Sequence, residues 1–134
     1  MRKTRTLQRG FSLIEIMVVV VIIGMLASIA TVGVITYIDK ARITTAKSQM
    51  KEFVKALDLY KMEKGSYPTS GEGLELLTKA QATGKPLLKD IPKDPWGRKY
   101  IYNSTGSNYE IISYGGNKRE GGTGIDADIR MKSD

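Results

Sequence analysis

Neither cysteine nor histidine occurs among the 134 residues. Without cysteine there is no disulfide framework, and no redox compartment can be inferred. Without histidine the chain lacks the commonest general base and the commonest zinc ligand. The glycine-rich stretch "GGNKREGGTG" also lacks the GxxxxGK[ST] spacing of a phosphate-binding loop. These absences give little support to a catalytic function.

Acidic residues are missing from the first ten positions, which carry four Arg or Lys. This short segment therefore supplies more than half of the formal net charge of +7. Residues 39–134 carry 17 basic and 13 acidic residues. If the basic leader is removed, the remaining chain is only mildly basic, and a phosphate-binding surface loses most of its support. We therefore expect no nucleic-acid partner.

A run without any charge extends from Ile16 to Ile38. As a helix it would span about 34 Å, enough to cross a hydrocarbon core of about 30 Å. The basic leader would stay in the cytoplasm by the positive-inside rule, which places the residues after Ile38 outside. The alternative is a secretory signal peptide cleaved near "SIA" at residues 28–30. The apolar character that continues through "TVGVITYI" favours the anchor.

One carboxylate, Glu15, lies just before the charge-free run. A carboxylate in hydrocarbon costs on the order of 2.5 kcal/mol or more, so a partner is expected, and the run contains no Lys or Arg. Cleavage between Gly10 and Phe11 would create a cation, the α-amine of Phe11. Glu15 could meet this amine in its own chain, about one helical turn away, or in a neighbouring subunit of a filament. In the second case it would set the register of assembly.

The stretch "RGFSLIE" followed by the apolar run resembles the class III signal of type IV pilins and type II secretion pseudopilins. The resemblance implies that a prepilin peptidase cuts after Gly10 and N-methylates Phe11, and that Glu15 guides subunit packing. Two further stretches, "YKMEKGSYPTSGEGLELL" and "DPWGRKYIY", resemble the major pseudopilin family, general secretion pathway protein G. The chain departs from the family near Val32. Many relatives have a helix proline there, whereas Gly33 is the only nearby helix breaker in this sequence.

The apolar run predicts one long helix that continues past Ile38 as an amphipathic half and ends at Gly65. Its apolar stripe, with lysines on the solvated face, consists of Ile43, Ala46, Met50, Phe53, Leu57 and Tyr60. A capping-box pattern, Thr69 with Glu72, predicts a short second helix over the leucines that follow. "RKYIY" and "NYEIIS" predict an antiparallel hairpin.

These elements predict an α+β fold, and the family resemblance implies that it is of the type IV pilin-like kind. In it, the long N-terminal helix packs on a small antiparallel β-sheet that is followed by a C-terminal loop. We expect three segments: a cleaved leader (1–10), the membrane and filament-core half of the helix (11–38) and a periplasmic globular domain (39–134).

The tail contains five glycines between residues 115 and 124, and a loop so rich in glycine can wrap tightly. Side-chain oxygens from Asn117, Asp126 and Asp128 are of the hard kind that suits Ca²⁺. Composition alone leaves a polar terminal loop as an equal alternative. The family resemblance implies a calcium site here, to which the Tyr114 carbonyl would also contribute. Asn117 stands where relatives have an aspartate, so the site would hold less charge.

The family resemblance therefore implies a structural subunit of a type II secretion pseudopilus. The expected partners are further copies of the chain, minor pseudopilins, an inner-membrane assembly platform and the prepilin peptidase. The expected location is the bacterial inner membrane, crossed once, with the C-terminal domain in the periplasm. Two alternatives remain: a type IV pilus or competence-type pilin, and a membrane-anchored calcium-binding or sensor domain.

Overall fold

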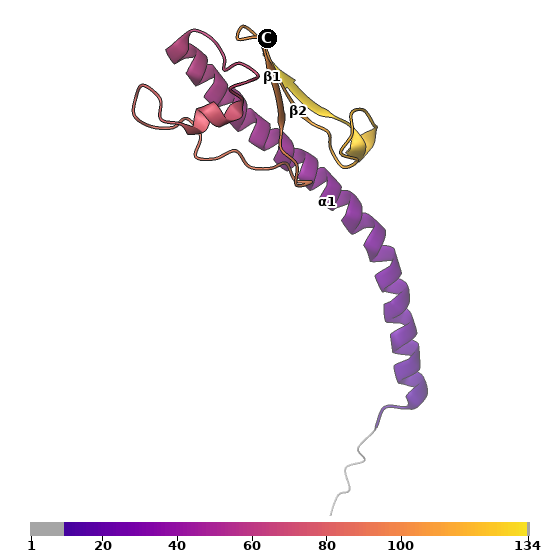
Figure 1. Ribbon diagram of the computed structural model, residues 1–134. Coiled ribbons are helices and arrows are strands. Elements are labelled where there is room, and N and C mark those ends of the chain that lie inside the picture. Colours follow the sequence, from indigo (N-terminus) through magenta and orange to yellow (C-terminus); the bar gives the residue numbers. More distant parts are fainter. Residues whose placement is uncertain (1–9, 134) are drawn as a thin grey trace, which may run out of the picture. The chain divides into compact units, whose positions relative to one another are not determined.

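The computed structural model describes residues 10–133, without the side chains of residues 30–33. The basic leader before Gly10 therefore lies outside the described residues. Val32 and Gly33, to which the missing proline relates, fall in the stretch whose side chains are not described. The chain divides into two compact units between Tyr37 and Ile38. One helix, α1 (Leu13–Lys64), contributes to both units (Figure 1).

The C-terminal end of α1 lies where the sequence predicts it. Gly65 follows the last helical residue with φ 83°, a left-handed conformation that suits glycine. Its N–H donates to the Lys61 carbonyl at 2.7 Å, which satisfies one of the last carbonyls of the helix.

The predicted apolar stripe of α1 is confirmed. Four of its members are almost completely buried, and the other two pack partly buried against the same core. Phe53 meets Tyr100 edge-on with ring centroids 5.1 Å apart. The predicted solvated face is confirmed as well, because its lysines are exposed. The stripe and the sheet thus share one hydrophobic core.

The predicted short second helix is present as a single 3-10 segment, η1 (Leu74–Thr78). The capping pair does form, since Glu72 accepts hydrogen bonds from the Thr69 N–H at 2.8 Å and from its hydroxyl at 2.9 Å. It closes a separate turn, however, because Gly73 with φ 67° breaks the chain direction before the leucines begin.

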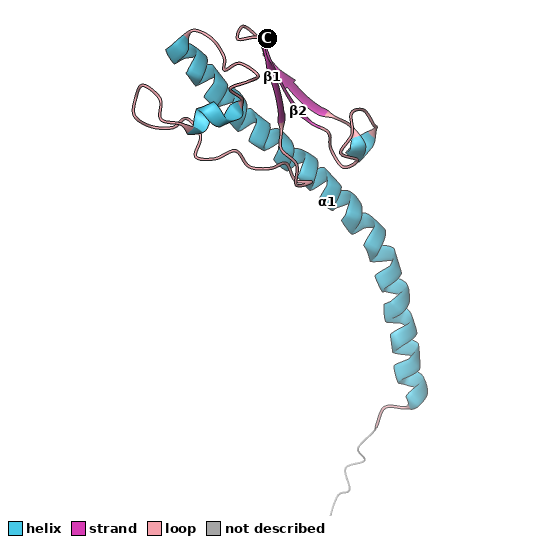
Figure 2. Ribbon diagram, in the orientation of Figure 1, coloured by secondary structure: helices cyan, strands magenta, loops and turns pink. Residues whose placement is uncertain are grey.

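The sheet has three antiparallel strands in the order β1-β2-β3 (Figure 2). They are β1 (Ile101–Ser104), β2 (Tyr109–Ser113) and β3 (Ile129–Lys132). The predicted hairpin is confirmed, although β1 begins three residues later than "RKYIY" does. The third strand corrects the expectation that the tail is only a loop.

Side chains on β3 alternate, with Ile129 buried, Met131 partly buried against the core, and Arg130 and Lys132 on the other face. Tyr102, Ile111 and Met131 stand in register across the three strands on the core side. The charged side chains of β3 therefore lie on the outer face of the sheet.

Candidate functional site

The first candidate site is the segment that precedes α1. Gly10 is exposed, and the Phe11 side chain is 84% exposed. Ser12 is the last residue before the helix, and its carbonyl accepts the Ile16 N–H at 3.3 Å. The bond on the carboxyl side of Gly10 is thus in non-helical, accessible chain.

Glu15 closes a capping box with Ser12. Its carboxylate accepts the Ser12 N–H at 3.0 Å, and its own N–H donates to the Ser12 hydroxyl at 3.3 Å. The pattern S-x-x-E in the sequence is the local signal of such a box. The carboxylate therefore points back toward the residue that follows Phe11.

The N-terminal half of α1 presents its apolar side chains to the outside. In the part of the chain that the structure describes, α1 is the one helix long and apolar enough to cross a membrane. Its apolar segment is not buried by the rest of the described chain. Such a surface requires lipid or other apolar helices around it.

The second candidate site is the tail loop, residues 114–128, which connects β2 to β3. It contains the short 3-10 segment η2 (Gly124–Asp126). The loop is tightly wrapped, as its glycines predict. A Cβ on Gly122 would lie 2.3 Å from the Asp126 carbonyl oxygen, and one on Gly115 would lie 2.8 Å from the Ala127 carbonyl oxygen.

Two of the predicted ligands, Asn117 and Asp128, both bond to the backbone of Gly121. The Gly121 N–H donates to both carboxylate oxygens of Asp128, each at 3.1 Å. The Gly121 carbonyl accepts from the Asn117 amide at 3.3 Å, while the Asn117 side-chain oxygen accepts the Arg119 N–H at 3.0 Å. Asn117 and Asp128 thus close the loop on its own backbone.

Arg130 supplies the main charge beside Asp128. Its guanidinium lies 2.8 Å from Asp128, 3.1 Å from Glu120 and 3.4 Å from Glu110. The hydrogen bond from Arg130 is the first cause that holds the pKa of the Asp128 carboxyl below its usual value, and the Gly121 N–H adds to it. Lys132 pairs with Glu110 at 3.3 Å. Sequence analysis missed this cluster because it did not predict β3.

The calcium prediction meets an unfavourable arrangement of donors. Among the described residues no group of three or more acidic side chains is placed to hold a metal ion. Asp128 is already paired with an arginine, and the Asn117 oxygen is taken by a backbone N–H. Asp126 lies close to Gly116, and Tyr114 lines a hollow together with Asp94. Since Ca²⁺ requires six to eight oxygens, these residues as arranged do not fit it.

A buried carboxylate, Asp94, fixes the start of the tail loop. It accepts the Trp96 and Arg98 N–H groups at 3.1 and 2.8 Å, and the Ser113 hydroxyl at 2.8 Å. Arg98 in turn donates to the Lys118 carbonyl. The "DPWG" stretch thus binds the end of β2 and the loop after it, a structural role that the sequence did not indicate.

Comparisons with known proteins agree with this architecture. The family model described as type II secretion system (T2SS), protein G, matches residues 33–132, and the prokaryotic N-terminal methylation motif matches residues 5–31. The type II secretion system core protein G of Pseudomonas aeruginosa is 43% identical, over 93% of this chain and 95% of that protein. The Vibrio cholerae protein of the same name is 38% identical, over 96% and 94%.

A solved structure is also similar. It is the crystal structure of the major pseudopilin from the type 2 secretion system of enterohaemorrhagic Escherichia coli. The sequences are 26% identical, and the match covers 69% of this chain and 83% of that one with a TM-score of 0.57.

Proposed function

The chain belongs to the type II secretion system protein G family, and on this premise we propose that it polymerises into the periplasmic pseudopilus that helps to drive folded substrates through the outer membrane. The pseudopilin function is favoured over a pilus subunit and over a monomeric sensor, because the similar proteins are core protein G chains and a major pseudopilin. The observation that carries the proposal is the N-terminal half of α1, which is apolar and uncovered.

That surface serves two states. Lipid can cover it before assembly, and like helices of other subunits can cover it in a filament, since lipid tails and leucine-rich helices are similarly apolar. Before assembly, the chain would therefore cross the inner membrane once, with residues 39–134 in the periplasm. It would then be extracted with the help of the assembly platform and the minor pseudopilins.

Processing would prepare the chain for assembly. A prepilin peptidase would cut after Gly10 and N-methylate Phe11, as the match to the methylation motif supports. The exposed, non-helical chain from Gly10 to Ser12 supports access by such an enzyme. The new cationic amine would lie one residue before Ser12, whose N–H already bonds Glu15.

Glu15 would then have two functions that can be separated. In its own chain it caps α1, which a glutamine at the same position would also do. Toward the Phe11 amine of a neighbouring subunit it supplies a negative charge, which glutamine cannot do. A buried carboxylate without a cation is costly, so pairing would favour one register of packing over others.

The experiment compares Glu15→Gln, Glu15→Val and the control Glu63→Gln, which removes an exposed acid from the other end of α1. Each variant is produced together with the peptidase and the assembly platform, and filaments in the sheared fraction are counted by electron microscopy. All three should insert into the inner membrane. We expect the control to form filaments at the parent's yield and both Glu15 variants to form few.

Normal filament yield with Glu15→Gln but not with Glu15→Val would reduce Glu15 to a helix cap. Normal yield with both variants would refute any role of this carboxylate in assembly.

A further inference from the structure

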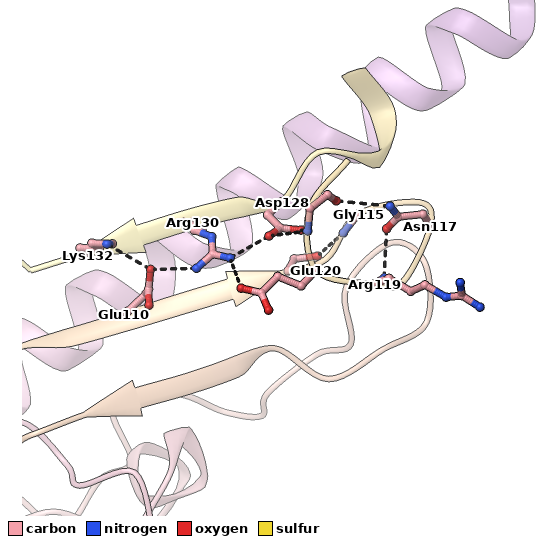
Figure 3. A network of polar contacts seen from close by, with 10 residues as sticks. Glu110, Gly115, Asn117, Arg119, Glu120, Asp128, Arg130 and Lys132 are labelled. Atoms are coloured by element: carbon pink, nitrogen blue, oxygen red, sulfur yellow. Dashed lines mark hydrogen bonds and ion pairs between the residues drawn. The ribbon is translucent and has the colours of Figure 1, made fainter. Parts of the chain in front are cut away.

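Arg130 lies at the centre of the outer face formed by β2, β3 and the tail loop. Its guanidinium contacts three carboxylates that come from different segments: Glu110 on β2, Glu120 in the loop and Asp128 at the loop's end (Figure 3). The Arg130 side chain is 35% exposed and that of Asp128 only 9%. The shortest contact is thus also the one best shielded from solvent.

The backbone dictates this arrangement. Residues two apart in an extended chain project to the same face, so the side chains of Asp128 and Arg130 lie next to each other on one face. The β2–β3 register pairs Glu110 with Lys132 and Ile112 with Arg130. Glu110 is therefore a diagonal neighbour of Arg130, within reach of a long side chain.

We propose that Arg130 takes the place of a divalent cation in the tail loop, so that this subunit closes the loop without calcium. The guanidinium neutralises Asp128 and ties both the middle and the end of the loop to β2. This inference concerns the folded domain, and it does not depend on the proposed assembly function.

Charge is the first argument. A guanidinium stays protonated at all relevant pH values and offers five donors in a planar fork, which suits several carboxylates at once. A Ca²⁺ ion at Asp128 would have to displace this cation or lie beside it, and like charges at such a distance repel. Asn117 contributes no charge to compensate. The lowered pKa of Asp128 agrees with a carboxylate that already has its cation.

The second argument is the hydrogen bonding inside the loop. Both Asp128 oxygens accept the Gly121 N–H, and the Asn117 oxygen accepts the Arg119 N–H. A metal ion at this place would therefore have to share these oxygens with protein donors. The Asn117 amide N–H donates to the Gly121 carbonyl, so this carbonyl oxygen is hydrogen-bonded within the loop as well.

Trp96, the single tryptophan, offers a local probe of this loop. Its indole nitrogen lies 3.5 Å from the point where a Gly116 Cβ would be. Thermal melts of the full-length chain in detergent can therefore be followed by Trp96 fluorescence. The conditions are chelator, Mg²⁺, and about 1 mM Ca²⁺, the range of weak extracellular calcium modules.

The parent chain should melt at the same temperature in all three conditions. Arg130→Gln should melt lower by about 3–8 °C, because several carboxylates lose their shared cation. It should also gain a rise in Tm with Ca²⁺ that Mg²⁺ does not reproduce, since the freed carboxylates can bind the larger ion. Arg119→Gln is the matched control. Figure 3 shows its guanidinium pointing away from the carboxylates, so the variant should melt like the parent.

Two results of these melts would overturn the proposal. A rise in the parent's Tm with Ca²⁺, reversed by chelator, overturns the proposal. Equal melting of Arg130→Gln and Arg119→Gln overturns it too, because the guanidinium would then hold nothing. If Arg130→Gln does not fold, Arg130→Lys replaces it. This variant keeps one charge without the planar fork, so it should melt below the Arg119→Gln control and show no calcium response. A melting temperature of Arg130→Lys equal to that of Arg119→Gln, or a rise in its Tm with Ca²⁺, would contradict the proposal.

Discussion

Replacing Asp94 with alanine should strongly destabilise the domain that follows Ile38. The carboxylate is 5% exposed and accepts three hydrogen bonds, two from backbone N–H groups of the "DPWG" stretch and one from the Ser113 hydroxyl. A hydrogen bond to a charged group contributes about 1.5–3 kcal/mol. Because the loop can relax and admit water to the two backbone donors, we expect a net loss of about 3–5 kcal/mol rather than the full sum.

For a domain of this size, each kcal/mol changes Tm by about 4–8 °C, so Asp94→Ala should lower Tm by at least about 12 °C. Asp94→Asn should cost much less, about 1 kcal/mol, because its oxygen still accepts both N–H groups and the Ser113 hydroxyl can turn to accept from the amide. Asp90→Ala is the matched control, since Asp90 is exposed in the same connection and its loss should change stability by less than about 0.5 kcal/mol.

The assay is thermal unfolding of the full-length chain in detergent, followed by fluorescence of the single tryptophan. The reasoning is refuted if Asp94→Ala and Asp90→Ala melt within about 2 °C of each other, less than half a kcal/mol apart. Equal destabilisation by Asp94→Asn and Asp94→Ala would show that the charge, rather than the acceptor geometry, holds the loop.

Three other expectations follow from single features. Phe53→Ala should cost about 3–5 kcal/mol in chemical unfolding, whereas Leu59→Ala on the exposed side of α1 should cost under about 1 kcal/mol. Gly122→Ala should destabilise more than Gly121→Ala in thermal melts: both need positive φ, but only at Gly122 does a Cβ meet a backbone oxygen, at 2.3 Å. The folded pKa of Asp128 is depressed, so its stabilisation is present above the unfolded value and is lost as pH falls; Tm should drop between about pH 5 and pH 2, and less steeply in Asp128→Asn.

The long helix could be predicted from sequence because its signals are strong and local. The sequence has an uncharged run of membrane length, and the structure has one helix there. The 3-4 apolar spacing corresponds to a buried stripe that includes Leu57, and the terminal glycine, Gly65, ends the helix. Such patterns follow from helix geometry alone and require no knowledge of the partner surface.

The tail was harder to predict because β3 is four residues long and follows a glycine-rich loop. Its alternation of Ile129 and Met131 with charged residues was present, but a strand of that length is specified mainly by the strand it pairs with. Without β3, the Arg130 cluster could not be placed. The Asp94 contacts depend on Ser113, which is 19 residues away, and no local pattern encodes such a pairing.

The intact mass of the subunit recovered from sheared filaments tests the central claim most directly. We expect a filament protein that begins at Phe11 and carries one N-methyl group. A filament fraction without this protein, or a mature chain that begins at Thr31 after cleavage at the secretory-type "SIA" sequence, would contradict it.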